Sequence, residues 1–234
     1  MKPTILLGTA LIPDTRTELK LYSHDGEFSI KIPGRGELMN TRVHGSEIAL
    51  AELACERMAE KQTPRVLVGG LGMGFTLAAA LKSAGPTAEV VVAELVPEVV
   101  EWNRTLMGEA SGHPLSDPRS KVHVGDVAEL IRSEKGGFDA IMLDVDNGPE
   151  AMIRRENNWL YTIAGLEAAR RALRPGGVLA VWSAGPDQMF KARLHHAGFK
   201  VEEKIVRPNR SGKGSRHYIW VGTSRVTSRA SSGV

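Results

Sequence analysis

The stretch Arg65-Val66-Leu67-Val68-Gly69-Gly70-Leu71-Gly72-Met73-Gly74 decides the fold of this chain. Its short apolar run breaks into glycines, and the segment from Phe75 to Leu81 then resumes with the apolar spacing of a helix. This order predicts a buried strand, a tight turn and a helix start. Glycines let the backbone approach a ligand, and unpaired N–H groups at a helix N-terminus attract polar or anionic atoms. We therefore expect a ligand site at this turn.

The next apolar run, from Glu89 to Glu94, ends in a carboxylate about 20 residues after the last glycine, the separation at which a second strand delivers an acid to ribose hydroxyls. Dinucleotide sites use G-x-G-x-x-G. Here the glycines follow G-x-G-x-G, and Phe75 stands at the third glycine's place. This spacing resembles that of class I S-adenosylmethionine (AdoMet) enzymes and disfavours a nicotinamide or flavin. A turn that binds nothing is the alternative.

Composition sets broad limits on the class of protein. The 234 residues with 42% hydrophobic content fit one globular domain with a full core and room for a small appendage. A net charge of +3 does not by itself indicate a nucleic-acid partner. The single cysteine, Cys55, excludes an internal disulfide and suits a reducing compartment, so we predict a cytoplasmic protein without a membrane partner. The apolar start, residues 5–12, leaves a signal peptide as an alternative, although Pro13 stops it.

The first part of the chain predicts a small lead-in, residues 1–62. Residues 19–23 and 27–32 alternate apolar with polar around a turn, which indicates a β-hairpin. Residues 48–61 have helical rhythm, and Ser46 is a candidate N-cap for that helix. The main domain is predicted at 63–224, and the Ser/Thr/Arg-rich tail at 225–234 is predicted to be disordered.

From Arg65 onward, predicted strands and helices alternate, which indicates a parallel sheet with helices on both faces. The expected strands are 65–69, 89–94, 121–124, 138–144 and 178–182, and the expected helices are 75–81, 97–107, 127–134, 160–173 and 188–197. No helix separates the last two apolar runs, 200–206 and 218–221, so they are predicted to pair as an antiparallel hairpin. The predicted fold class is α/β, a Rossmann-like class I methyltransferase sheet closed by this hairpin.

Several motifs together resemble the spermidine synthase-like branch of the class I AdoMet-dependent transferases: Val66–Gly74, Glu94, Gly125-Asp126, the strand end at Asp144 and Leu173–Gly177. The lead-in also stands where that family has its N-terminal domain, so the resemblance covers most of the chain. It implies AdoMet or decarboxylated AdoMet as donor, and a homodimer. It also implies that Glu94 binds the ribose, Asp126 the adenine amine and Asp144 the acceptor amine as acid/base.

The chain departs from that family at three motifs. The family's glycine loop carries an aspartate for the donor's aminopropyl ammonium, where this chain has Gly72. Its Tyr-His-Glu is Gly45-Ser46-Glu47 here, so the catalytic tyrosine is absent from its usual place. The acidic loop is shortened to residues 144–149. We therefore expect methyl transfer slightly ahead of aminopropyl transfer.

Asp144 and Asp146 are the predicted catalytic pair. They follow a buried strand at its carboxyl end, where open α/β sheets bind ligands, and strand alternation puts them on one side. Two acids there suit a cationic amine that must be held and deprotonated, although a plain turn is the alternative. The predicted donor-binding residues are Gly70, Gly72, Gly74, Glu94 and Asp126, and the predicted substrate-binding residues are Glu47, Asn147 and Tyr161.

Glu94 and Asp126 could instead only cap helices. Tyr161 and Trp182 could instead only pack in the core. A basic loop holds Arg207, Arg210, Lys213, Arg216 and His217; we interpret it as a solvated surface loop, which makes nucleic acid an unlikely partner. No residue cluster has metal-ligand spacing, so no metal is predicted.

The sequence thus predicts an AdoMet-dependent transferase that moves a methyl group to a small amine-bearing acceptor. The alternatives are a divergent aminopropyltransferase that makes a polyamine from decarboxylated AdoMet, a nucleic-acid methyltransferase, and a non-catalytic nucleotide-binding or interaction protein on the same fold.

Overall fold

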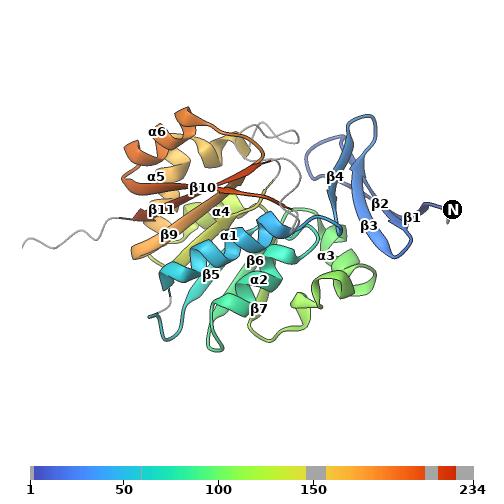
Figure 1. The fold of residues 1–234 in the computed structure, drawn as a ribbon, viewed down its shortest axis with the longest axis horizontal. Helices are drawn as coiled ribbons and strands as arrows, with labels where there is room; N and C mark the ends of the chain where they lie inside the picture. The colour runs from blue at the N-terminus through green and yellow to red at the C-terminus, as the bar shows by residue number, and fades with distance from the viewer. Residues whose placement is uncertain (1–2, 59, 146–156, 209–215, 225–234) are drawn as a thin grey trace, which may run out of the picture.

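The computed structural model describes residues 3–58, 60–145, 157–208 and 216–224, which form two sheets (Figure 1). The N-terminal sheet is antiparallel, and its strands follow chain order: β1 (Ile5–Leu11), β2 (Glu18–His24), β3 (Glu27–Ile32) and β4 (Gly36–Asn40). In Figure 1 this sheet stands to one side of the larger α/β body. The predicted hairpin of residues 19–32 is confirmed as β2 and β3.

The central sheet has seven strands in the order β10-β11-β9-β8-β5-β6-β7. They are β5 (Arg65–Gly69), β6 (Glu89–Glu94), β7 (Ser120–Val124), β8 (Phe138–Leu143), β9 (Leu173–Ser183), β10 (Phe199–Val206) and β11 (His217–Ser224). Strands β5 to β9 pair in parallel, whereas β11 is antiparallel to both β9 and β10. The predicted fold class, a parallel sheet closed by an antiparallel hairpin, is confirmed.

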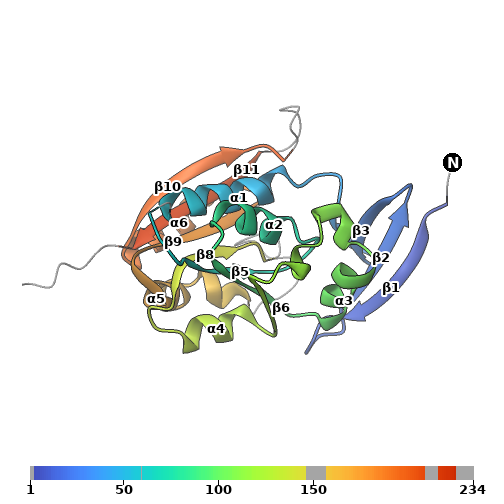
Figure 2. The same ribbon diagram turned by 90° about the horizontal axis from the view of Figure 1, so that it is seen from below.

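Helices cover both faces of the central sheet (Figure 2). They are α1 (Gly45–Cys55), α2 (Phe75–Ser83), α3 (Pro97–Thr105), α4 (Val127–Ser133), α5 (Ile163–Ala172) and α6 (Gln188–His196), with short 3-10 turns η1 (Glu56–Met58), η2 (Gly108–Ser111), η3 (Pro114–Ser116) and η5 (Asn157–Tyr161). Alternate residues of β5 face opposite sides, as a pleated strand requires. Val66 and Val68 pack with α1 and α2, and Leu67 packs with α4, α5 and α6.

A third hydrophobic cluster joins the N-terminal sheet to the α/β body. It includes Leu21 and Ile30 from the N-terminal sheet, Trp102 from α3, and Phe75 at the start of α2. Gly8 in β1 lies so close to the Trp102 indole that a Cβ there would be 2.7 Å from Nε1. The two parts of the chain therefore meet beside the glycine-rich turn, which lies between Gly69 at the end of β5 and Phe75.

The structure differs from the predicted elements in several places. The apolar start forms the edge strand β1, and residues 36–40 form β4; neither strand was predicted. Ser46 is not the cap of α1, because His44 is the N-cap residue and Ser46 lies inside the helix. The helix predicted over 160–173 is shorter, since α5 ends at Ala172 and Leu173 already belongs to β9.

The predicted boundary between lead-in and main domain lies near residue 62. Helix α1 precedes that boundary, yet its Leu50 and Ala54 pack with α2 and the central sheet. Within the described residues, no helix combines the length and the apolar character needed to cross a bilayer.

Candidate active site

The three glycines after β5 all adopt left-handed backbone conformations, with φ of 89° at Gly70, 52° at Gly72 and 85° at Gly74. Gly70 also lies against the strand end that carries Asp144, because a Cβ there would be 2.5 Å from the Asp144 carbonyl oxygen. At Gly74 a Cβ would be 2.8 Å from the Ser111 hydroxyl, so this glycine serves packing against η2. Gly70 and Gly72 line a cavity, whereas Gly74 is outside the two lining sets described below.

Glu94 ends β6 beside this turn, and its side chain is buried with 9% exposure. Its Oε2 accepts the backbone N–H groups of Leu71 at 3.0 Å and Gly72 at 3.4 Å, and its Oε1 accepts that of Val96 at 2.9 Å. Burial raises the pKa of Glu94, and these backbone hydrogen bonds oppose the rise. Backbone N–H groups thus hold the Glu94 carboxyl in place beside the glycine turn.

Glu94 lines a cavity of about 100 Å³, which we call the Glu94 cavity. Asp126 and Val127, after β7, line it on one side, and apolar residues of the N-terminal sheet such as Leu19 and Ile30 line it on another. Asp126 also caps α4, since its Oδ1 accepts the Ala128 N–H at 2.8 Å. The capping alternative for Asp126 is therefore confirmed, and the cap stands at the cavity.

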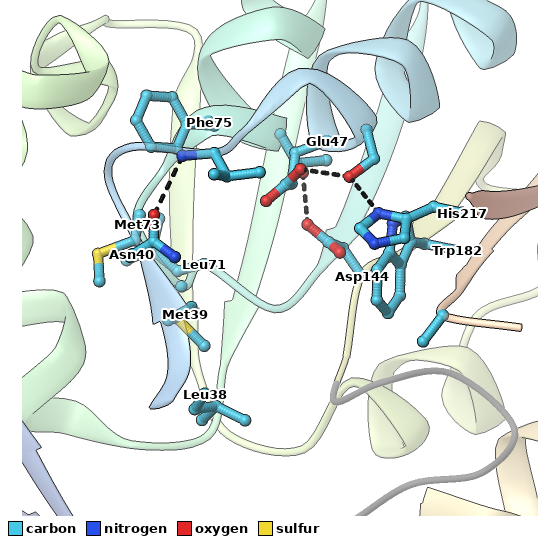
Figure 3. Close-up of a pocket in the computed structure, with 15 residues that line it drawn as sticks. Leu38, Met39, Asn40, Glu47, Leu71, Met73, Phe75, Asp144, Trp182 and His217 are labelled. Atoms are coloured by element: carbon cyan, nitrogen blue, oxygen red, sulfur yellow. Dashed lines mark hydrogen bonds between the residues drawn. The ribbon is translucent and has the colours of Figure 1, made fainter. Parts of the chain in front are cut away.

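A second cavity of about 280 Å³, the Glu47 cavity, lies next to it (Figure 3). It is lined by Leu38, Met39, Asn40, Val43, Ser46, Glu47, Leu71, Gly72, Met73, Phe75, Thr76, Asp144, Trp182, Ala184 and His217. Leu38, Met39, Gly72 and Asp144 line both cavities. Asp144, directly after β8, thus stands where the two cavities meet.

Asp144 shares the Glu47 cavity with another acid, Glu47 of α1, and Figure 3 shows the two carboxyl groups pointing toward one another. The Thr76 hydroxyl donates a hydrogen bond of 2.5 Å to Asp144. Burial and the negative charge of Glu47 raise the pKa of Asp144 to about 7, and the Thr76 bond opposes the rise. Burial also raises the pKa of Glu47. Because the two titrations are linked, the pair readily holds one proton at neutral pH.

A hydroxyl and an imidazole continue this pair toward β11. The Ser46 hydroxyl donates to Glu47 Oε2 at 2.7 Å, and His217 Nδ1 lies 3.0 Å from the same hydroxyl. The Trp182 ring meets His217 edge to face, with 4.9 Å between ring centroids. Ser46 is buried, and burial lowers the pKa of His217.

Neither Ser46 nor His217 was predicted as a site residue. His217 is the first residue of β11, which runs antiparallel to β9, so it begins at the edge where the parallel strands end. That topology was a usable signal, whereas nothing local marked the contact with Ser46. Met39 and Thr76 also line the site without having been predicted.

The other predicted site residues fall into two groups. Tyr161 packs in the core against Phe190, with centroids 5.7 Å apart, and its hydroxyl donates to the Val145 carbonyl at 3.3 Å. The structure therefore places Tyr161 apart from the cavity lining, in line with the packing alternative. Asp146, Asn147, Arg210 and Lys213 lie outside the described residues. Among the described residues, no cluster of acids, histidines and cysteine is arranged to hold a metal ion.

The sheet topology, the glycine turn and the acidic residue at the end of β6 together identify the fold as that of class I AdoMet-dependent transferases. Residues 50–200 match the family described as "Spermine/spermidine synthase domain". The match covers more than half of the chain, and the chain belongs to this family.

Individual relatives agree with that membership. A polyamine aminopropyltransferase of Nitrosomonas europaea is 36% identical over 125 residues, which are 52% of this chain and 36% of that protein. Putrescine N-methyltransferase 3 of Nicotiana tabacum is 31% identical over 161 residues, 67% of this chain and 37% of that protein. The matched segment thus spans little more than a third of either relative.

Solved structures extend the similarity of fold over nearly the whole chain. The spermidine synthase of Thermotoga maritima superposes with a TM-score of 0.74 at 17% identity, over 94% of this chain and 73% of that one. A spermidine synthase in complex with the transition-state analogue AdoDATO gives a TM-score of 0.71 at 19% identity, over 94% of this chain and 73% of that one. At this identity the likeness concerns the fold.

Proposed function

We propose that this chain is an AdoMet-type transferase that moves an aminopropyl group from decarboxylated AdoMet to a small amine. The observation that carries the proposal is a pair of acids in the Glu47 cavity: Glu47, and Asp144, which also lines the Glu94 cavity. The donor sulfonium and an alkylammonium acceptor are both cations, so adjacent carboxylates favour their approach. The names of most curated relatives support aminopropyl over methyl transfer, which reverses the order that the sequence alone suggested.

In this assignment the donor's nucleoside occupies the Glu94 cavity. Glu94 lines this cavity and accepts a hydrogen bond from a ribose hydroxyl, and Asp126 lines it as well and accepts from the adenine amine. The apolar residues of the N-terminal sheet suit an aromatic base.

The acceptor amine occupies the Glu47 cavity. An alkylammonium must lose a proton before its nitrogen can attack, and a base titrating near neutral pH is suited to take it. Asp144, with its pKa raised to about 7, is that base. The nitrogen lone pair then forms the new N–C bond while the C–S bond breaks, and its electron pair stays on sulfur.

Glu47 has a second task in this assignment. The donor's aminopropyl ammonium needs a negative partner, and Gly72 cannot supply one. Glu47 and Gly72 line the same cavity, so Glu47 supplies the negative charge that a glycine at position 72 cannot provide.

Methyl transfer from AdoMet is the second candidate. It is favoured by Gly72, because the carboxylate of AdoMet can be held by backbone N–H groups of the glycine turn and the start of α2 without an acid. The similarity to a putrescine N-methyltransferase supports the same candidate.

Calorimetry with AdoMet, decarboxylated AdoMet and methylthioadenosine tests both candidates, followed by product mass after incubation with putrescine. We expect decarboxylated AdoMet to bind more tightly than AdoMet and the product to gain an aminopropyl group. Asp144→Asn should keep donor binding and lower turnover by about 10²–10⁴, as for a lost general base. A methylated product would move methyl transfer to first place, and binding of none of the three ligands would contradict both candidates.

A further inference from the structure

Glu47, Ser46 and His217 form a hydrogen-bonded chain, and two of its members, Ser46 and His217, have no role in the transfer step described above. It joins residues that are 171 positions apart in the sequence, from α1 and the start of β11. All three side chains line the Glu47 cavity. We propose that Ser46 and His217 form a proton relay, through which the proton taken from the acceptor amine leaves the Glu47–Asp144 pair. This inference rests on the proposed function and adds two positioning residues to it.

The need for a relay follows from the proton balance. An alkylammonium and a sulfonium enter with one positive charge each, and a secondary ammonium and a neutral thioether leave. One proton is therefore released in each turnover. Asp144 takes this proton from the amine, and it must lose the proton again before the next acceptor binds. Both acids are half-buried at the wall of the Glu47 cavity, which restricts their direct exchange with water while a ligand fills that cavity.

The hydrogen-bond geometry provides a path with two states. When Glu47 is ionised, the Ser46 hydroxyl donates to it, so the Ser46 oxygen accepts from His217 and Nδ1 carries the imidazole proton. When Glu47 is protonated, it donates to Ser46, and Ser46 donates to Nδ1. Asp144 first gives its proton to the Glu47 carboxylate that it faces. The proton then passes from Glu47 through Ser46 to Nδ1 by exchange of these hydrogen bonds. His217 becomes an imidazolium and releases a proton from Nε2 to water, which restores the starting charges.

The electrostatic surroundings favour exchange along this path. Burial raises the pKa of Glu47 and lowers that of His217, which brings the two groups closer in proton affinity. Titratable and charged groups on the adjoining elements are Glu47 and His44 at α1, Asp144 after β8, Arg207 after β10 and Arg216 before β11.

The first arm of the test needs no substrate. NMR of the imidazole nitrogens, at a pH above both titrations, should find His217 with its proton on Nδ1. Ser46→Ala removes the bridging hydroxyl and should shift the ring toward the Nε2–H form. An Nε2–H ring in the unmodified protein, or no change in Ser46→Ala, would overturn the relay, whether or not the proposed function holds.

The second arm measures turnover with putrescine and either donor. His217→Gln and Ser46→Ala should each lower kcat about tenfold or more with both KM values unchanged, and the double variant should lose no more than the larger single effect. Added imidazole should partly restore His217→Ala. His196→Gln, on the exposed side of α6, is the matched control and should keep the parent rate.

The two arms separate the two ideas. A kcat within twofold of the parent in both variants would overturn the relay while the proposed function stands. If the parent transfers neither group, the proposed function fails, and the NMR arm alone decides whether the Glu47–Ser46–His217 chain couples these protons.

Discussion

Asp144 shows how one residue can cost stability at the site it serves. Its pKa in the folded protein lies near 7, above the ordinary value of 3.8, because of burial and the charge of Glu47. The folded state therefore binds a proton that the unfolded state has lost between these two pH values. The stability contributed by protonated Asp144 is complete below pH 3.8 and is lost as the pH rises through 7.

Asp144→Asn should therefore change the pH dependence of stability. The amide stays neutral and can still accept the Thr76 hydrogen bond, so the variant avoids the loss above pH 7. At pH 8 we expect the free energy of unfolding of the variant to exceed that of the parent by about 1 kcal/mol or more. Each kcal/mol corresponds to a rise in Tm of about 2–4 °C. At low pH the two Tm values should match. Thermal unfolding monitored by circular dichroism across this range measures the difference.

Glu47→Gln provides the comparison for this prediction. It removes the charge that raises the pKa of Asp144, so the pH at which the parent loses stability should move downward. Identical Tm profiles for the parent and Asp144→Asn would show that the Asp144 carboxyl is not perturbed by folding.

At the scale of elements, the glycine turn is held in place by its neighbours. Glu94 at the end of β6 accepts N–H groups of the turn, and Asn103 of α3 donates to the Gly72 carbonyl at 2.8 Å and to the Val99 carbonyl at 2.9 Å. The left-handed conformations of the turn are thus fixed from two sides before a ligand binds. In the proposed function, this preorganisation lowers the entropic cost of binding the donor.

Glu94→Gln tests this support. The amide has one acceptor oxygen, so at least one of the three N–H groups that Glu94 accepts would face an NH₂ group, which costs about 1–3 kcal/mol when buried. We expect the Kd of the donor to rise by about one to two orders of magnitude and Tm to fall. Calorimetry and thermal unfolding measure both. Glu89→Gln, at the other end of β6 and paired with Arg65, should leave the Kd unchanged.

How far the sequence predicted each element depended on the range of the interactions that fix it. The strands β5, β6 and β8 were predicted because local apolar runs determine them, and the rule for strand ends then placed Glu94 and Asp144 at one edge. The edge strands β1 and β4 were missed, since β1 exposes several apolar residues and contains Gly8, and none of the five residues of β4 is fully buried. The contact of Ser46 with His217 depends on the pairing of β11 with β9, which no local pattern encodes.

At the scale of the whole molecule, the two sheets meet at the site. Met39 of β4 and Gly72 of the glycine turn both line the two cavities, and a Cβ at Gly72 would lie 3.1 Å from the Met39 sulfur. The N-terminal sheet therefore occupies the space into which an acidic side chain at position 72 would extend. If the proposed function holds, we expect both parts of the chain to influence the choice of donor.

Gly72→Asp, alone and combined with Met39→Ala, tests this interpretation. Aspartate tolerates a left-handed conformation such as the φ of 52° at Gly72 better than most residues do, and Met39 is flexible enough to move. The new carboxylate should bind the aminopropyl ammonium and repel the carboxylate of AdoMet. The ratio of the two Kd values should then shift about tenfold or more toward decarboxylated AdoMet, the effect of one charged hydrogen bond. The shift should be larger in the double variant, where the thioether no longer competes for space.

Met39→Ala alone is the control and should leave the ratio close to that of the parent. Competitive calorimetry measures the ratios. An unchanged ratio in both Gly72→Asp variants would place the ammonium elsewhere, beyond the reach of position 72.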